Sequence, residues 1–102
     1  MDIKYSVAPD GLYLYLAGEL DEHYSKQARE KIDALIDKYS TARSVVFNMK
    51  GLSFMDSTGI GMLIGRYKKL KSLKIPAYIE NPSFAADKVF SASGIYTLIP
   101  KL

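Results

Sequence analysis

The sequence contains no cysteine and no tryptophan, and its only histidine is His23. Without cysteine there is no disulfide, thiolate metal site or thiol nucleophile, and nothing favours an oxidising compartment. No apolar run approaches the ~20 residues that span a bilayer, and Met1 to Lys4 shows no charged segment leading into an apolar one. We therefore expect a cytoplasmic protein that is neither exported nor inserted in a membrane.

A chain of 102 residues can bury one core, and no linker, repeat or low-complexity tract divides it. We expect a single domain over residues 1–102. The net charge is +3, with the cations concentrated between Arg66 and Lys74. These cations suit the carboxyl end of a helix, and their alternative role is to recognise an acidic protein patch. We expect no direct nucleic-acid partner, because exposed aromatic residues do not alternate with the cations.

Hydrophobic patterning predicts an α/β domain. Residues alternate over 3–7 and 12–17, on either side of the turn Pro9-Asp10-Gly11, which predicts an antiparallel hairpin. Helical spacing predicts helices that begin near Tyr24, Ser57 and Phe84, and short apolar runs predict strands at 45–49, 75–79 and 95–99. The predicted mixed sheet has about five strands, the N-terminal hairpin followed by parallel strands, and is packed by about three helices.

The segment Asp56-Ser57-Thr58-Gly59 joins the buried strand at 45–49 to an amphipathic helix. Right-handed crossovers between parallel strands place this segment at the carboxyl edge of the sheet. Ser57 at a helix entrance is a candidate N-cap, and an N-cap hydroxyl is exposed. The helix dipole is positive there, so a negative charge on Ser57 would be tolerated locally.

Two enzyme-like motifs fit the sequence poorly. A nucleophile-elbow serine hydrolase needs glycine two residues before Ser57, where Met55 stands, and His23 would be its only base. The glycines from Gly59 to Gly65 follow the pattern G-x-G-x-x-x-G, one residue longer than the dinucleotide fingerprint. Gly61 and Gly65, one helical turn apart, instead let the helix approach the sheet or a partner closely. We expect no catalytic residues and no cofactor.

Glu19, Asp21 and His23 form a short polar segment before the first predicted helix. Their oxygen and nitrogen atoms could in principle gather a metal ion, although such a run is more often a solvated turn. We expect no metal site there.

Three ordered segments resemble the signatures of one family. Leu52–Gly61, continuing through Gly65–Lys68, closely resembles the phosphorylation loop and following helix of the bacterial anti-sigma factor antagonists, in the STAS-domain family. Gly18–Asp21 resembles the second signature of that family and Phe90–Ile95 the third, so the resemblance covers nearly the whole chain. Its closeness suggests a sporulation-type member. Family members usually carry a further C-terminal helix, whereas this sequence ends shortly after its last predicted strand. We therefore expect that helix to be short or absent and part of one sheet face to be less covered.

The resemblance implies an interaction protein that is switched by phosphorylation, not an enzyme. Ser57 would accept phosphate from an anti-sigma factor that is also a serine kinase, and a separate serine phosphatase would remove it. The unphosphorylated form would bind the anti-sigma factor and release a sigma factor. The resemblance and the chemistry of the loops place partner contacts at Glu19, Asp21, Asp56, Thr58, Gly59 and Gly61.

Two other functions stay open. One is a subunit of a stress-sensing complex that uses the same serine, and the other is a nucleotide- or anion-binding STAS domain that uses the positive helix end.

Phosphorylation would add nearly two negative charges beside Asp56. The helix end offsets about 0.3–1 kcal/mol of this, whereas an interface fitted to a neutral hydroxyl would lose several kcal/mol. The switch is therefore expected to change binding, not the fold.

Overall fold

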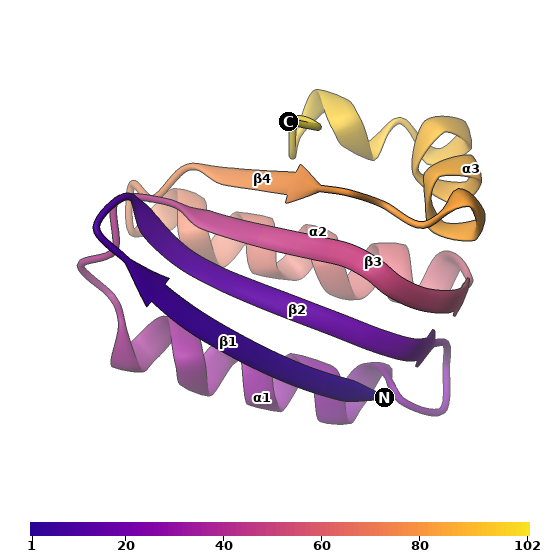
Figure 1. The fold of residues 1–102 in the computed structure, drawn as a ribbon, viewed down its shortest axis with the longest axis horizontal. Helices are drawn as coiled ribbons and strands as arrows, with labels where there is room; N and C mark the ends of the chain where they lie inside the picture. Colours follow the sequence, from indigo (N-terminus) through magenta and orange to yellow (C-terminus); the bar gives the residue numbers. More distant parts are fainter.

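The computed structural model describes residues 1–102 as a mixed four-stranded sheet with helices packed against it (Figure 1). The elements in chain order are β1 (Asp2–Ala8), β2 (Gly11–Leu20), α1 (Ser25–Lys38), β3 (Val45–Met55), α2 (Ser57–Ser72), β4 (Ala77–Glu80), α3 (Phe84–Ser93) and the 3-10 helix η1 (Ile95–Thr97). The strand order is β1-β2-β3-β4, in which β1 and β2 are antiparallel and the other pairs are parallel. The predicted α/β class, hairpin and three helices are confirmed.

The last predicted strand, in contrast, is wrong. Ile95 and Ile99 are buried, but they lie in and just after η1, which follows Gly94 in the left-handed region at φ +75°. The Ile99 N–H donates to the Ile95 carbonyl at 2.9 Å, as in a helical turn. Only Lys101 forms an isolated parallel bridge, with Ile79 of β4. Two apolar residues four positions apart fit one helical turn as well as a strand, so the pattern could not distinguish the two.

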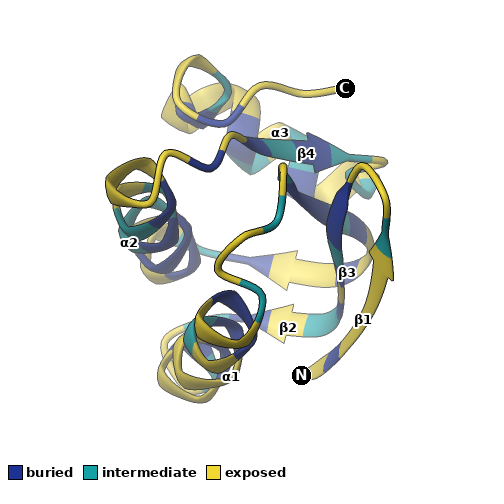
Figure 2. Ribbon diagram, turned by 90° about the vertical axis from the view of Figure 1, so that its left-hand side faces the viewer, coloured by how far each residue is buried: buried dark blue, intermediate teal, exposed yellow.

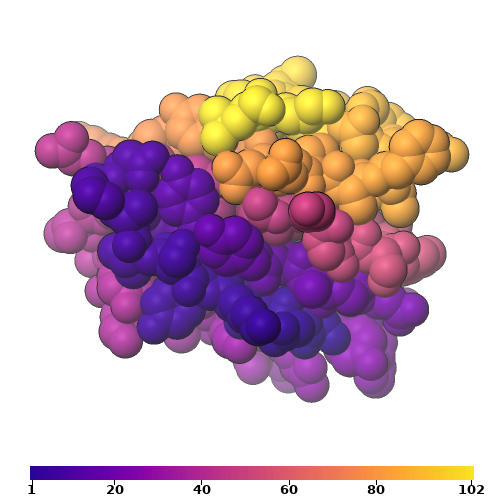
Figure 3. All heavy atoms as spheres, viewed as in Figure 1, coloured from indigo at the N-terminus to yellow at the C-terminus, as the bar shows by residue number.

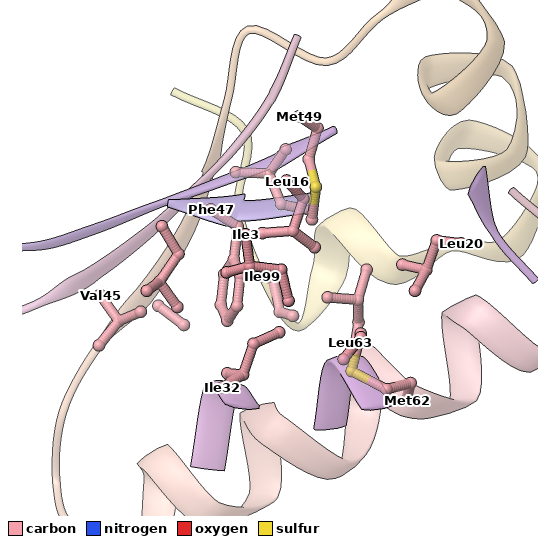
Figure 4. Close-up of a cluster of buried hydrophobic side chains, with 14 of the residues drawn as sticks. Ile3, Leu16, Leu20, Ile32, Val45, Phe47, Met49, Met62, Leu63 and Ile99 are labelled. Atoms are coloured by element: carbon pink, nitrogen blue, oxygen red, sulfur yellow. The ribbon is translucent and has the colours of Figure 1, made fainter. Parts of the chain in front are cut away.

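Helices α1 and α2 cover one face of the sheet (Figure 2), while α3 contacts β3 beyond the end of β4 (Figure 1). Side chains from this face and from the helices, among them Leu16, Phe47, Ile32 and Leu63, form the core (Figure 4). Seen from the opposite face, the strands lie in front of α1 and α2 (Figure 1), and residues from the N-terminal part of the chain form much of this surface (Figure 3). None of the helices combines the length and the apolar character that crossing a membrane requires.

Two strands continue further than their hydrophobic pattern indicated. β3 passes its predicted end at Met49 and runs to Met55, and β2 runs to Leu20, which pairs with Met55. Residues expected in loops therefore belong to the sheet, where Glu19 lies opposite Phe54. This pairing fixes the position of the chain just before α2.

Candidate functional site

Ser57 is the first residue of α2, two positions after β3 ends at Met55. Because β2 and β3 are parallel and Leu20 pairs with Met55, the connections that follow these strands lie side by side at one edge of the sheet. Ser57 is exposed at this edge. The predicted placement of the serine is thus confirmed, and the residue is open to solvent.

Asp56, not Ser57, is the N-cap of α2. Asp56 has an extended backbone, with φ −123° and ψ −174°, and its Oδ1 accepts a hydrogen bond from the Gly59 N–H at 3.1 Å. The carboxylate thereby satisfies one of the free N–H groups in the first helical turn. The prediction of a Ser57 cap is wrong by one residue. Its consequence is that the Ser57 hydroxyl is not used to start the helix.

The other residues expected to contact a partner at the start of α2 differ in their exposure. Thr58 and Gly61 are exposed. Gly59 is buried, and a Cβ at this position would lie only 2.6 Å from the backbone oxygen of Leu20. Gly59 therefore allows α2 to begin tightly against the end of β2, and its influence on the surface is indirect.

Asp21 organises the turn that leads into α1. Its Oδ1 accepts a hydrogen bond from the Tyr24 N–H at 3.1 Å, and its carbonyl oxygen accepts one from Ser25 Oγ at 2.6 Å. Glu19 is exposed at the end of β2. No group of three or more histidine or carboxylate side chains is arranged to hold a metal ion, so Glu19, Asp21 and His23 do not converge on one.

Three surface hollows surround the start of α2. The first, of about 740 Å³, is lined by Asp21, Asp56 and Phe54, and Phe54 is 48% exposed. The second, of about 410 Å³, lies between α2 and α3, and Ser57 and Lys88 share it. The third, of about 530 Å³, lies between α1 and α2. Ser57 therefore stands beside recessed surface and not on an isolated protrusion.

The hollow between α2 and α3 brings together two of the segments that carried the sequence resemblance. Ile60 and Val89 supply its apolar wall, and Ala92 and Ser93 belong to the segment Phe90–Ile95. No sequence motif pointed to Val89, or to Lys88 beside it. Nothing in the local pattern of α3 could show that these residues lie beside Ser57, because that neighbourhood arises only from the folded chain.

The cations of α2 are not all free at the surface. Arg66 is 8% exposed, and its Nε lies 2.8 Å from Asp33 Oδ1 of α1. Lys69 Nζ lies 2.8 Å from Asp37 Oδ1, also of α1. Burial lowers the pKa of Arg66, and the neighbouring Asp33 partly opposes this. Part of the basic stretch therefore joins two helices of this domain.

The match to a model of the STAS domain covers residues 2–102, and the chain belongs to this family. The anti-sigma F factor antagonist of Lysinibacillus sphaericus is 39% identical over 89 residues, which cover 87% of this chain and 75% of that protein. The anti-sigma-B factor antagonist of Bacillus subtilis is 28% identical over 99 residues, covering 97% and 86%. The family resemblance seen in the three sequence segments is confirmed.

Solved structures support the same relationship. The anti-sigma factor antagonist SpoIIAA in its unphosphorylated form matches with a TM-score of 0.78 and 31% identity, over 99% of this chain and 88% of that chain. The Bacillus cell fate determinant SpoIIAA in its phosphorylated form matches with a TM-score of 0.71 and 31% identity, over 99% and 91%. Both matches extend over nearly the whole chain.

Proposed function

We propose that this protein is an anti-sigma factor antagonist of the SpoIIAA type that is switched by phosphorylation of Ser57. The unphosphorylated form binds an anti-sigma factor and so releases a sigma factor, and phosphorylation abolishes this binding. The anti-sigma factor is also the serine kinase, and a serine phosphatase restores the hydroxyl. The protein is then a substrate, not an enzyme, and acts in the cytoplasm, where sigma factors meet RNA polymerase.

The observation that carries this proposal is the exposed Ser57 at the start of α2, with the cap hydrogen bond made by Asp56. Because the Ser57 hydroxyl does not cap the helix, it can be esterified without removing a contact that stabilises the fold. Relatives that are anti-sigma factor antagonists support the assignment of the partner. A solved relative in a phosphorylated form supports the chemistry of the switch.

The surface around Ser57 suits a partner that recognises a neutral hydroxyl. The apolar side chains of Ile60 and Val89 lie on one side of it, and Asp21 and Asp56 line the hollow on the other. Carboxylates at an interface pair with cations of a partner. A phosphate dianion placed between these two regions would be desolvated on binding and would repel the carboxylates. Its effect on affinity therefore exceeds its effect on stability.

The remaining predicted contacts extend this surface. Thr58 and Gly61 continue it along the exposed side of α2, and Glu19 adds a carboxylate at the end of β2. Gly59 supports the surface from beneath, by letting α2 approach Leu20.

Phosphate mapping tests the proposal directly. The protein is mixed with ATP and the anti-sigma factor encoded in the same genome, and modified peptides are identified by mass spectrometry. We expect one phosphate, on Ser57, in the natural protein and in Thr58→Ala, and none in Ser57→Ala. A phosphate on Thr58 in the natural protein, or no phosphate although the kinase modifies an established antagonist, would contradict the proposal.

A further inference from the structure

The hollow between α1 and α2 has a positive character. Its lining includes Lys26 and Arg29 from α1 and Arg66 from α2, against the single carboxylate of Glu22. Only Met62 contributes a hydrophobic side chain. Because the walls are polar and mainly cationic, the hollow favours an anionic occupant and not an apolar one.

Arg66 is the most informative residue of this hollow, because it is buried without full pairing. Its Nε contacts Asp33 Oδ1 at 2.8 Å, but this ion pair lacks hydrogen-bond geometry and Nη1 has no hydrogen-bond partner. The nearby Arg29 adds like-charge repulsion and helps to lower the pKa of Arg66, after the larger effect of burial. Buried polar groups are normally satisfied, so the unpaired Nη1–H of Arg66 can bind an acceptor that another molecule supplies.

Gly61 and Gly65 also line the hollow, and the structure gives no internal reason for either. A Cβ built at either position meets no atom within 4 Å, in contrast to the 2.6 Å approach to Leu20 at Gly59. Glycine inside a helix is less stable than alanine, because it loses more backbone entropy on folding. The idea that these glycines let α2 approach the sheet is therefore wrong. A close approach by another molecule is the alternative explanation.

We propose that this hollow receives a carboxylate-bearing segment of the anti-sigma factor. An aspartate or glutamate of that segment lies among Lys26, Arg29 and Arg66, and supplies the acceptor that the guanidinium lacks. The backbone of the segment lies against the bare surface at Gly61 and Gly65. The inference rests on the proposed function and identifies the chemistry of its partner.

The position of the hollow supports a shared interface. Thr58, directly after the phosphorylated residue, is one of its lining residues. One bound segment can therefore contact the first turn of α2 and the cationic walls together. The interface extends in this way from the loop around Ser57 onto α1, beyond the residues that the sequence indicated.

Two variants test the hollow without removing a contact of the fold. Arg29→Glu reverses an exposed charge and relieves the repulsion of Arg66, and Gly65→Ala adds a methyl group in open space. We expect each to weaken the affinity for the anti-sigma factor about tenfold or more, measured by calorimetry, while the melting temperature is unchanged or raised. Arg29→Glu should also reduce the dependence of affinity on salt concentration. Lys31→Glu, an exposed charge reversal on α1 outside the hollow, should change affinity less than about twofold.

The results separate this inference from the proposed function. If the natural protein binds and is phosphorylated on Ser57, but both variants bind equally well, the hollow is not a docking site and the proposed function stands. If the natural protein does not bind the anti-sigma factor, both fail. A titration with inorganic phosphate that shifts the NMR signals of Arg29 and Arg66 at millimolar concentration, with no effect on partner affinity, identifies a small-anion site and also overturns the inference.

Discussion

Asp56 Oδ1 accepts a hydrogen bond from the Gly59 N–H at 3.1 Å, across the first turn of α2. The residue between the cap and the helix interior is Ser57, whose side chain is exposed and has no part in this bond. The helix cap and the exposed hydroxyl therefore belong to adjacent residues. The proposed phosphorylation of Ser57 would leave the Asp56 cap in place.

Asp56→Ala should lower the free energy of unfolding by about 1 kcal/mol, because it removes the cap acceptor. Asp56→Asn, which keeps an acceptor at the same place, should recover most of this loss. Ser57→Ala should stay within about 0.5 kcal/mol of the natural protein. Urea denaturation followed by circular dichroism measures all three. Equal losses in Asp56→Ala and Ser57→Ala would show that the hydroxyl also caps the helix.

Ser57→Asp should fold normally and lose partner affinity. A carboxylate at the helix start is stabilised by about 0.3–1 kcal/mol, so the melting temperature should change little. A charge buried in the proposed interface costs about 3 kcal/mol or more, which corresponds to about a hundredfold loss of affinity.

Calorimetry with the anti-sigma factor measures this affinity, and Ser57→Ala, which should bind persistently, is its control. A large drop in the melting temperature of Ser57→Asp would show that the switch acts on the fold, contrary to this prediction.

Gly59→Ala and Gly61→Ala place the same methyl group two residues apart on α2, with opposite expected results. At Gly59 the added Cβ would lie 2.6 Å from the Leu20 backbone oxygen, which cannot rotate away. We expect a loss of about 1–3 kcal/mol in unfolding free energy. At Gly61 the methyl meets nothing within 4 Å, and we expect a gain of about 0.5–1 kcal/mol. Chemical denaturation of both variants measures these changes in unfolding free energy. A Gly59→Ala variant as stable as the natural protein would show that the end of β2 can move to make room for the methyl group.

The two ion pairs between α1 and α2 should contribute very differently. Asp33→Asn leaves Arg66 buried without its counter-charge, although the Asp33 side chain is itself 29% exposed, and should cost about 1–3 kcal/mol. Asp37→Asn affects a pair whose carboxylate side chain is 67% exposed, and should cost less than about 0.5 kcal/mol. The two variants can be compared in one series of urea titrations. Similar losses would mean that the burial of Arg66 does not decide the energetics.

The sequence could predict those parts of the fold whose local and overall preferences agree. The hairpin around Pro9-Asp10-Gly11, the buried strand from Val45 and the helices were correctly identified, because each has a clear hydrophobic period or turn chemistry. The carboxyl ends of β2 and β3 were missed, since polar and small residues there hide a strand that is held by pairing Leu20 with Met55. The predicted fifth strand at 95–99 is absent because its apolar pattern is too short to distinguish a strand from a helical turn.

The sequence could predict the location of Ser57, which a motif fixes, but not the features of the site that depend on residues distant in the chain. Ser57 was correctly placed at the exposed start of α2, but Asp56 and Ser57 both favour N-caps, and only the end of β3 sets which residue takes that place. The sequence pattern predicts a surface cation at Arg66, whereas the folded chain buries it beside Asp33, a residue thirty-three positions earlier. Lys88 lies beside Ser57 only because α3 folds back to α2.

Asp87 should make stability sensitive to acid. Hydrogen bonds from the Tyr96 hydroxyl at 2.6 Å and from Lys101 Nζ at 3.1 Å hold the pKa of Asp87 below its usual value. The unfolded carboxyl, with a pKa of about 3.9, therefore binds a proton before the folded one does as the pH falls. The stabilising contribution is fully present above that pH and is lost below it, towards the lower pKa of the folded state.

Tyr96→Phe removes the stronger of the two hydrogen bonds, so it should raise the pKa of Asp87 and flatten the loss of melting temperature below about pH 4. NMR titration of the Asp87 carboxyl gives the pKa, and melting curves between about pH 2 and pH 6 give the stability profile. Tyr78→Phe, which alters a tyrosine on β4 away from this carboxylate, should leave both unchanged. An Asp87 carboxyl that titrates at its ordinary value in the natural protein would show that the Tyr96 and Lys101 contacts do not persist in solution.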